Sequence, residues 1–315
     1  MIISASRRTD IPTVYSEWFY NRVKEGFVLV PNPMNIHMIS KVSLSPEVID
    51  GIVFWTKNPI PMMDRLSELD KYKGRYYFTF TINSYGKDAE PHLPSKKDEL
   101  IPAFIELSKR LGKHRVCWRY DPIFLSDKYN IDYHVQKFEY LASRLGPFTE
   151  KCTVSFIDMY TRTQRNTREL NSRAPSAEEE LQILKLLVTI AERNGIYIDT
   201  CSERRDFSEI GVQHAHCIDK DRLERIGGYS LDVGKDKNQR LECGCFSSID
   251  IGSYNTCRNG CLYCYANFNS ELVERNCAMH NPESPLLYGE VGPDDIIKER
   301  DMKSQIIMPG LFDLK

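Results

Sequence analysis

Short apolar segments alternate with helical patterns along the first two hundred residues, and this alternation limits the folds open to the chain. Six runs are nearly continuous in apolar residues, which is typical of parallel strands buried on both faces. The strands are predicted at Ile2–Ser6, Ile52–Thr56, Tyr77–Ile82, Val116–Tyr120, Thr153–Ile157 and Ile196–Thr200. A further strand or hairpin is predicted at Phe27–Pro31.

Helical patterns separate these strands. Gly112 and Gly146 follow two of the helices, and Ser176 with Glu179 forms a capping box that opens the last one. The helices are predicted at Val14–Glu25, Pro61–Leu69, Ser95–Leu111, Asp132–Leu145 and Ser176–Asn194. Strands and helices that alternate at this spacing form βαβ units with right-handed crossovers. We therefore expect an α/β fold, a (β/α) TIM-like barrel that is complete or partial.

In a (β/α) barrel the reacting groups lie at the carboxyl ends of the strands. Polar and charged residues stand at or just after these ends in the sequence. They include Arg7, Arg8, Asp10, Lys57, Arg119, Asp121, Asp158, Tyr160 and Glu203. Loops are usually polar, so an ordinary solvated surface accounts for about half of them. Charged residues on the last strand positions themselves, as in WRYDP and SFIDMY, favour a functional site.

The composition favours a globular protein with a metal site. Of the 315 residues 41% are hydrophobic and 27% charged, and no apolar run is long enough to span a membrane. The N-terminus lacks the apolar core of a secretory signal, so we expect a cytoplasmic protein. Thiols stay reduced in that compartment, and ten cysteines then indicate metal or cluster binding rather than disulfides. Cys117 and Cys152 lie in apolar runs and are expected in the core.

Three cysteines in the run CRNGCLYCYAN form the most specific motif. Cys257, Cys261 and Cys264 are spaced so that they can bind three irons of a four-iron four-sulfur cluster and leave the fourth iron open. The alternatives are a zinc site completed by a fourth cysteine, or cysteines without metal. Zinc knuckles favour Cys-x2-Cys pairs, so the three-residue gap fits zinc less well.

Four more cysteines form a second possible ligand set. Cys243 and Cys245 lie in ECGC, and Cys201 and Cys217 are their natural partners. Together they would supply four thiolates, and we expect an auxiliary four-iron four-sulfur cluster, with zinc or no metal as the alternatives. Cys277 could replace a member of this set, but we expect it to be an ordinary cysteine without a metal. His214 and His216 have a spacing that metal ligands also show, but a histidine pair in a polar loop is more often unligated.

The cysteine run resembles that of the radical S-adenosylmethionine enzymes, including the aromatic Tyr263 before the last cysteine. The wording YCYA is most similar to spore photoproduct lyase-like proteins. Nearly the whole chain also resembles an uncharacterised bacterial family of unknown function. This second resemblance rests on the opening SASRRTDIP, the middle segments FWTKNP and WRYDPI, and the closing segment QRLECGCFSSIDIGSYNTCRNGCLYCYAN.

The order of the segments differs from that of radical S-adenosylmethionine enzymes, because here the cysteine loop follows the strand–helix series instead of opening it. A circular permutation reconciles the two orders. The segment 248–255 would then be a strand beside the N-terminal strand, and a short helix would follow the loop. We expect a barrel core over 1–205, a cysteine-rich iron–sulfur segment over 206–280 on the barrel mouth, and a tail over 281–315.

The resemblance implies a catalytic role for the cluster. In that reading S-adenosyl-L-methionine binds the open iron, its reductive cleavage gives a 5′-deoxyadenosyl radical, and the radical removes a hydrogen atom from a substrate. Tyr263 would pack near the adenine, and Tyr160 would act as a hydrogen donor. Arg119 and Asp121 are further catalytic candidates. The residues expected to hold cofactor and substrate are Arg7, Arg8, Asp10, Lys57, Asp158 and Glu203.

The expected partners are a small-molecule, nucleotide or nucleic-acid substrate and a low-potential electron donor such as flavodoxin or ferredoxin, without a membrane. Arg162, Arg165, Arg168 and Arg173 follow the fifth strand and could clamp phosphates, or lie in a solvated loop. The net charge of −2 does not by itself indicate nucleic-acid binding. The alternative function is a non-catalytic barrel protein that holds zinc or iron–sulfur clusters and binds nucleic acid.

Overall fold

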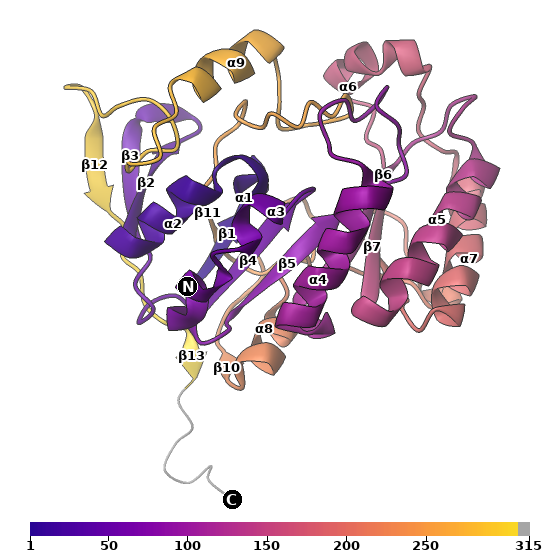
Figure 1. Cartoon of the computed structure of the whole chain (residues 1–315), viewed down its shortest axis with the longest axis horizontal. Coiled ribbons are helices and arrows are strands. Elements are labelled where there is room, and N and C mark those ends of the chain that lie inside the picture. Colours follow the sequence, from indigo (N-terminus) through magenta and orange to yellow (C-terminus); the bar gives the residue numbers. More distant parts are fainter. Residues whose placement is uncertain (308–315) are drawn as a thin grey trace, which may run out of the picture.

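The computed structural model describes residues 1–307, and its centre is one sheet of eight parallel strands (Figure 1). The strand order is β11-β1-β4-β5-β6-β7-β8-β9, so from β1 onward it follows the order of the chain. These strands are β1 (Ile2–Ala5), β4 (Gly51–Thr56), β5 (Tyr76–Thr81), β6 (Val116–Ile123), β7 (Lys151–Phe156), β8 (Tyr197–Thr200), β9 (Gln213–His214) and β11 (Ile249–Asp250). All six strands predicted for the first two hundred residues are confirmed.

Smaller strands lie outside this sheet. The predicted segment at Phe27–Pro31 is β2 (Phe27–Asn32), which pairs antiparallel with β3 (Asn35–Ser43). β12 (Ile296–Glu299) joins the other side of β3 in parallel. β10 (Ser230–Leu231) and β13 (Ile306–Ile307) form a short antiparallel pair. The predicted tail 281–315 therefore packs in part against the N-terminal half, and its last eight residues lie outside the described part of the chain.

Four of the five predicted helices are confirmed, whereas the one predicted at Pro61–Leu69 is a short α-helix, Ile60–Met63, followed by a 3₁₀ turn, Leu66–Tyr72. Ser176 and Glu179 form the expected capping box, and Gly112 and Gly146 stand at the C-termini of α4 and α5. The α-helices are α1 (Ile11–Val14), α2 (Ser16–Glu25), α3 (Ile60–Met63), α4 (Ile101–Leu111), α5 (Ile131–Leu145), α6 (Thr161–Asn166), α7 (Ala177–Arg193), α8 (Lys220–Gly227) and α9 (Ser270–Ala278). A π turn, Lys96–Leu100, leads into α4, and 3₁₀ turns occupy Leu66–Tyr72, Lys113–Arg115, Gly146–Phe148, Arg168–Leu170 and Ser208–Ile210.

The two faces of the sheet are covered differently, because neighbouring strand residues point to opposite sides. Ile52 and Phe54 of β4 pack in the large core together with buried residues of α2, α4, α5 and α7, which lie on one face (Figure 1). Val53, between them, packs on the other face with α8 and with the segment 215–245 that carries three of the cysteines. The crossover helices thus cover one face, and a cysteine-bearing segment covers part of the other.

A closed TIM barrel is not found. β9 and β11 form the two edges of the sheet and do not pair with each other within residues 1–307. β9 is only two residues long and pairs with β8 through Gln213 and His214. The chain then turns back over the sheet at 215–245 instead of adding further strands. The expectation of a full barrel is corrected to an α/β fold with a large parallel sheet flanked by helices.

The strand predicted at 248–255 occupies the place expected for it. Its ordered part is β11, which pairs in parallel with β1 through Ile3–Ile249 and Ser4–Asp250. α9 follows the cysteine loop, as predicted. Among the helices of residues 1–307, none is long and apolar enough to cross a membrane.

Candidate functional site

A cavity of about 510 Å³ lies where the parallel strands end. Residues that follow β1, β4, β6, β7 and β8 line it, together with the segments 239–245 and 254–267. All ten candidates from the strand ends and the cysteine loop contribute to its wall: Arg7, Arg8, Asp10, Lys57, Arg119, Asp121, Asp158, Tyr160, Glu203 and Tyr263. The seven predicted metal-binding cysteines line the same cavity: Cys201, Cys217, Cys243, Cys245, Cys257, Cys261 and Cys264.

Asp250 fixes the strand that carries the cysteine loop. One carboxylate oxygen accepts hydrogen bonds from Ser4 Oγ (2.9 Å) and from the backbone N–H of Arg7 (2.8 Å). The other accepts from Ser6 Oγ (2.6 Å) and from the backbone N–H of Gly252 (3.0 Å). A carboxylate can accept about four such bonds, so Asp250 is fully used in joining β11 to the end of β1.

The loop itself is held by Asp10 and by a glycine. Asp10 Oδ2 accepts from Asn259 Nδ2 (2.9 Å), within the cysteine run, and from the backbone N–H of Lys57 (2.7 Å). Gly260 has φ +69°, and a Cβ there would lie 2.5 Å from the His92 ring. Asp10, predicted to hold the cofactor, thus also positions the loop between Cys257 and Cys261.

The three cysteines of the cysteine loop are half-buried at the wall of the cavity. Burial raises the pKa of Cys257 well above its usual range and also raises that of Cys264. Burial raises the pKa of Cys261 to about 12, although the nearby Lys57 ammonium acts in the opposite direction. Thiolates in such a place need a cation to stabilise them, and a metal is the usual one.

Behind the loop, Tyr263 belongs to a buried polar network. Its hydroxyl donates to Glu90 and accepts from Lys57 Nζ (2.9 Å) and Asn83 Nδ2 (3.0 Å). Glu90 also forms ion pairs with Lys57 (2.8 Å) and Lys96 (2.5 Å). Burial opposes the ionised carboxylate, but the two ammonium groups lower the pKa of Glu90 to about 2. Tyr263 and Lys57 are therefore anchored by their polar ends while they line the cavity.

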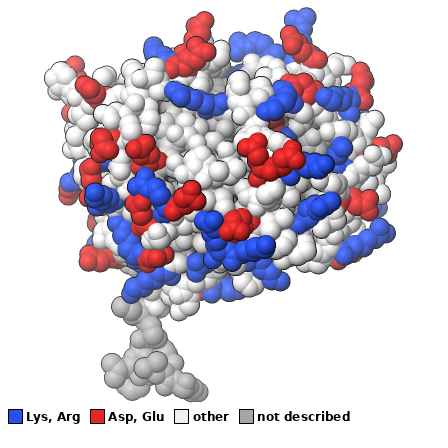
Figure 2. Space-filling model, in the orientation of Figure 1, with Lys and Arg blue, Asp and Glu red and all other residues white. Residues whose placement is uncertain are grey.

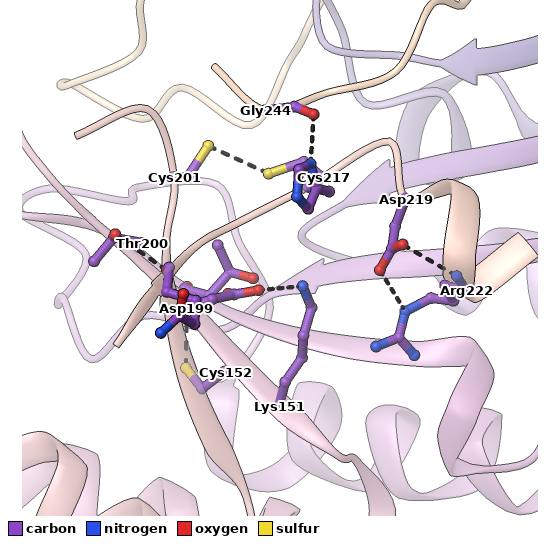
Figure 3. A network of polar contacts seen from close by, with 12 residues as sticks. Lys151, Cys152, Asp199, Thr200, Cys201, Cys217, Asp219, Arg222 and Gly244 are labelled. Carbon is purple, nitrogen blue, oxygen red and sulfur yellow. Dashed lines mark hydrogen bonds and ion pairs between the residues drawn. The ribbon is translucent and has the colours of Figure 1, made fainter. Parts of the chain in front are cut away.

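The second cysteine set forms a connected group. Cys201 and Cys217 approach to 3.2 Å between their sulfurs (Figure 3), and Arg119 Nη1 donates to Cys217 Sγ (2.9 Å). The hydrogen bonds with Cys201 and Cys245, with Arg119 nearby, hold the pKa of Cys217 well below its usual value. The hydrogen bond with Cys245 likewise lowers the pKa of Cys243 to about 6. The four residues thus meet in space, as predicted, beside one arginine.

No group of three or more His, Cys, Asp or Glu side chains is arranged to hold a single metal ion within the described part of the chain. One zinc ion with Zn–S bonds of about 2.3 Å would bring its sulfur ligands to within about 4 Å of each other. An iron–sulfur cube spaces its cysteines more widely, because each sulfur binds a different iron. A four-iron four-sulfur cluster therefore does not require its cysteines to meet around a single point.

Buried Arg119 and half-buried Asp121 form an ion pair on β6. Arg119 Nη2 lies 2.8 Å from Asp121 Oδ2, and Ser155 Oγ donates to the other carboxylate oxygen. The Arg119 guanidinium also lies over the Trp55 ring, 5.3 Å from its centroid. Although burial opposes the charge, Asp121 and Cys217 raise the pKa of Arg119 well above its usual value, so it stays cationic. Arg119 thus contacts both Cys217 of the second cysteine set and Asp121 in the wall of the cavity.

Other candidates lie on the rim. Arg240 pairs with Asp158 (2.6 Å) and donates to the Tyr160 hydroxyl, and Tyr160 is 48% exposed. Glu203 accepts from the backbone N–H of Phe156 (2.8 Å), and burial raises its pKa to about 7. Glu203 is thus a carboxyl group at the cavity that changes its charge near neutral pH, a property common at functional sites.

The loop arginines after β7 do not line this cavity. Arg173 forms a two-fold ion pair with Glu179 (2.6 Å), and Arg162 lies over the Phe268 ring at 4.0 Å. On the face shown in Figure 2, basic and acidic side chains are interspersed. The interpretation as a solvated, acid-paired loop holds for Arg173.

Three cysteines lie apart from the cavity. Cys117 and Cys152 are buried on strands, as expected. Cys277 is also buried and donates to the backbone oxygen of Thr256 (3.2 Å). His216 bonds through its ring to the backbone oxygen of Gly244 (2.5 Å) and is exposed.

Sequence reasoning missed several residues that build the site. Glu90 follows β5 in an irregular segment where no periodic pattern marks buried positions, whereas Asn83 was expected at the end of that strand. Asn259 and Asp250 stood inside predicted segments, but their partners lie about 250 residues away in sequence. The acidic residue in the middle of the apolar strand SIDIG was a usable signal for Asp250, since a charge there needs buried partners.

Comparison with protein families finds one match, a domain of unknown function (DUF1848), over residues 2–266. The chain belongs to this family. The match includes both cysteine sets and the strand ends that form the cavity, and it stops before α9. Comparison with curated proteins finds no match.

Proposed function

We propose that this protein is a radical S-adenosylmethionine enzyme whose cluster binds Cys257, Cys261 and Cys264. One observation carries the proposal: a Cys-x3-Cys-x2-Cys loop with an aromatic residue lines a cavity at the carboxyl ends of a parallel sheet. When bound, a four-iron four-sulfur cluster with S-adenosylmethionine supplies a 5′-deoxyadenosyl radical that abstracts hydrogen from a substrate. The carboxyl ends of parallel strands are where α/β enzymes place their reactive groups.

The residues present fit such a group. Three thiols supply three ligands, which leaves one iron for the amino and carboxylate groups of S-adenosylmethionine. Beyond the loop, the cavity supplies acids and arginines suited to those groups and to ribose hydroxyls, among them Asp121, Arg119 and Glu203. The Asn267 Oδ1 atom is buried at the cavity without a hydrogen-bond partner in residues 1–307, so an acceptor is free there.

The chain itself fixes the geometry. Asp10, Asn259 and Gly260 hold the loop in one conformation, so the three thiols are positioned before any ligand binds. Lys57 places a buried positive charge beside Cys261. A cation close to a cluster favours its reduced form, which is the form that donates an electron.

The fold supports a more specific interpretation as well. Strands that follow chain order, with the crossover helices on one face, support an incomplete (β/α) barrel. β11 lies beside β1 on the side away from β4, where a first strand would precede β1. This placement supports a circular permutation of the radical S-adenosylmethionine arrangement.

We further propose an auxiliary cluster on Cys201, Cys217, Cys243 and Cys245. The four line the same cavity as the first three, and Cys201 and Cys217, whose sulfurs are 3.2 Å apart, would separate to bind different irons. Arg119 touches Cys217, and hydrogen bonds to a ligating sulfur tune a cluster's potential. The shared cavity supports transfer of an electron, or binding of a substrate, between the two sets.

Anaerobic reconstitution tests the proposal. The purified chain is given iron and sulfide, then S-adenosylmethionine and dithionite, and 5′-deoxyadenosine is quantified. We expect a brown protein with about four irons for one cluster, or about eight for two. Cys261→Ala should abolish the product, whereas Cys152→Ala, a buried thiol outside the cavity, should retain it. A colourless protein with bound zinc, or product formation by Cys261→Ala, would refute the assignment and favour a structural metal site.

A further inference from the structure

A second cavity of about 450 Å³ adjoins the first and is built from other segments. Its wall includes the end of β2, the residues around Ser248 and the position after β12. The two cavities share five residues of their walls: Arg7, Arg8, Gln239, Tyr254 and Tyr265. Both volumes fall in the range of small-molecule sites, about 300–1,000 Å³. The two cavities are therefore neighbours, with these five residues between them.

Three arginines from distant parts of the chain line this second cavity: Arg7, Arg8 and Arg300. Neither Arg8 nor Arg300 forms an ion pair with any carboxylate of residues 1–307. Arg7 bonds to Ser248 (2.8 Å), but its Nε and Nη1 atoms are buried and find no hydrogen-bond partner in that range. Buried donors of a charged group are costly unless a ligand satisfies them.

The two acids in the wall offset only part of the positive charge of the three arginines. Asp250 already accepts four hydrogen bonds, as described above. Asp236 accepts from the backbone N–H of Asn238 (3.0 Å) and from Gln239 Nε2 (3.2 Å), and lies 3.8 Å from Arg7. The lining therefore leaves guanidinium donors for an anion, with neutral donors such as Asn32 nearby.

We propose that this second cavity binds the phosphate group of a small phosphorylated substrate. Three guanidinium groups match a dianion with three terminal oxygens better than a carboxylate with two. The rest of the substrate would pass between Arg7 and Tyr254 into the first cavity, toward the cysteine loop. The contacts of the lining arginines support the phosphate site by themselves, whereas its role in substrate binding rests on the proposed function.

Calorimetric titration tests the phosphate site on the anaerobically purified protein before S-adenosylmethionine is added. The probes are inorganic phosphate and ribose 5-phosphate, with acetate and ribose as their counterparts. We expect the two phosphorylated probes to bind, and Arg8→Gln and Arg300→Gln each to weaken them tenfold or more. Arg168→Gln removes the same charge from an exposed position outside both cavities and should bind as the parent does.

The proposal is overturned if neither phosphorylated probe binds saturably, if acetate binds as tightly as phosphate, or if both arginine variants bind like Arg168→Gln. Binding of inorganic phosphate without binding of ribose 5-phosphate would also overturn it, because the ligand would then not be a phosphorylated substrate. The 5′-deoxyadenosine assay is independent, since this titration requires no cofactor cleavage. If either the titration or the 5′-deoxyadenosine assay fails, the other can therefore still be interpreted.

Discussion

Asp250 offers the sharpest structural test, because it joins the strand before the cysteine loop to the first strand of the chain. Asp250→Ala removes the acceptor for two hydroxyls and two backbone N–H groups. The two hydroxyl protons can rotate toward another acceptor, while the hydroxyl oxygens keep their donors, Trp55 Nε1 at Ser4 (3.1 Å) and the backbone N–H of Arg8 at Ser6 (2.9 Å). The two backbone donors, of Arg7 and Gly252, lose their only side-chain acceptor.

Each unsatisfied, partly buried donor costs about 1–3 kcal/mol, so Asp250→Ala should lower the free energy of unfolding by about 3 kcal/mol. Asp250→Asn keeps one acceptor oxygen and should lose about half of that. Urea unfolding followed by circular dichroism gives the total change. Hydrogen exchange of the Arg7 and Gly252 amides shows whether the change is local to the junction.

Asp294→Ala is the matched control, because Asp294 is exposed and outside the cavities, and its effect should stay within about 0.5 kcal/mol. The reasoning is refuted if Asp250→Ala is as stable as this control. It is equally refuted if the Arg7 and Gly252 amides keep the parent's exchange rates, since the carboxylate would then not hold the two strands together.

Three further changes test the site. Gly260→Ala places a Cβ 2.5 Å from the His92 ring at φ +69°, so it should destabilise the loop by about 1–2 kcal/mol and lower the iron retained after reconstitution. Tyr263→Phe removes the hydroxyl that bonds to Lys57 and Asn83 and should lower the free energy of unfolding by about 1–3 kcal/mol, measured by urea unfolding. Glu203→Gln should make stability less dependent on pH. The pKa of Glu203 is raised to about 7 from 4.5, so its neutral form stabilises the fold below about pH 4.5 and this contribution disappears as the pH rises through 7. The variant should therefore match the parent at pH 4.5 and exceed it at pH 8.5, by on the order of 1 kcal/mol after solvent screening.

Each of these has a distinct contradictory result. Unchanged iron content in Gly260→Ala would show that the loop tolerates a side chain there. Full stability of Tyr263→Phe would mean that the Glu90 network does not depend on the phenol. A parallel pH profile for Glu203→Gln and the parent would mean that Glu203 titrates as an exposed carboxyl group.

The sequence predicted the parts of the fold that carry strong periodic signals. The apolar strands such as Val116–Tyr120, and the helix opened by Ser176, were placed within a few residues because local pattern and burial agree there. The position of β11 beside β1 was also predictable. That prediction came from the resemblance of the cysteine loop to radical S-adenosylmethionine enzymes, with the order of the segments permuted.

Closure of the barrel was not predictable from local patterns. Whether a last strand pairs with the first depends on contacts across the whole chain, and here a two-residue β9 is followed by a segment that covers the sheet. β3 was predicted only as one alternative, the hairpin after Phe27–Pro31, and β12 was missed because all of its residues are exposed, so burial leaves little pattern in its sequence.

The sequence indicated which residues belong to the site more readily than it indicated which residues they contact. The seven cysteines share a cavity as expected, because parallel strands bring their carboxyl ends to one edge. Which acid each cation meets could not be predicted. Lys57 bonds to Glu90 in an irregular segment, and Arg240 bonds to Asp158 across 82 positions of sequence.

The proposed open iron is most directly tested by electron paramagnetic resonance of the reduced, reconstituted protein before and after S-adenosylmethionine is added. A Cys243→Ala/Cys245→Ala variant removes two thiols of the second set and isolates the first. We predict a reduced four-iron signal that changes shape when the cofactor binds, and loss of that signal in Cys261→Ala. A protein without this signal, or a signal that S-adenosylmethionine leaves unchanged, would contradict the account.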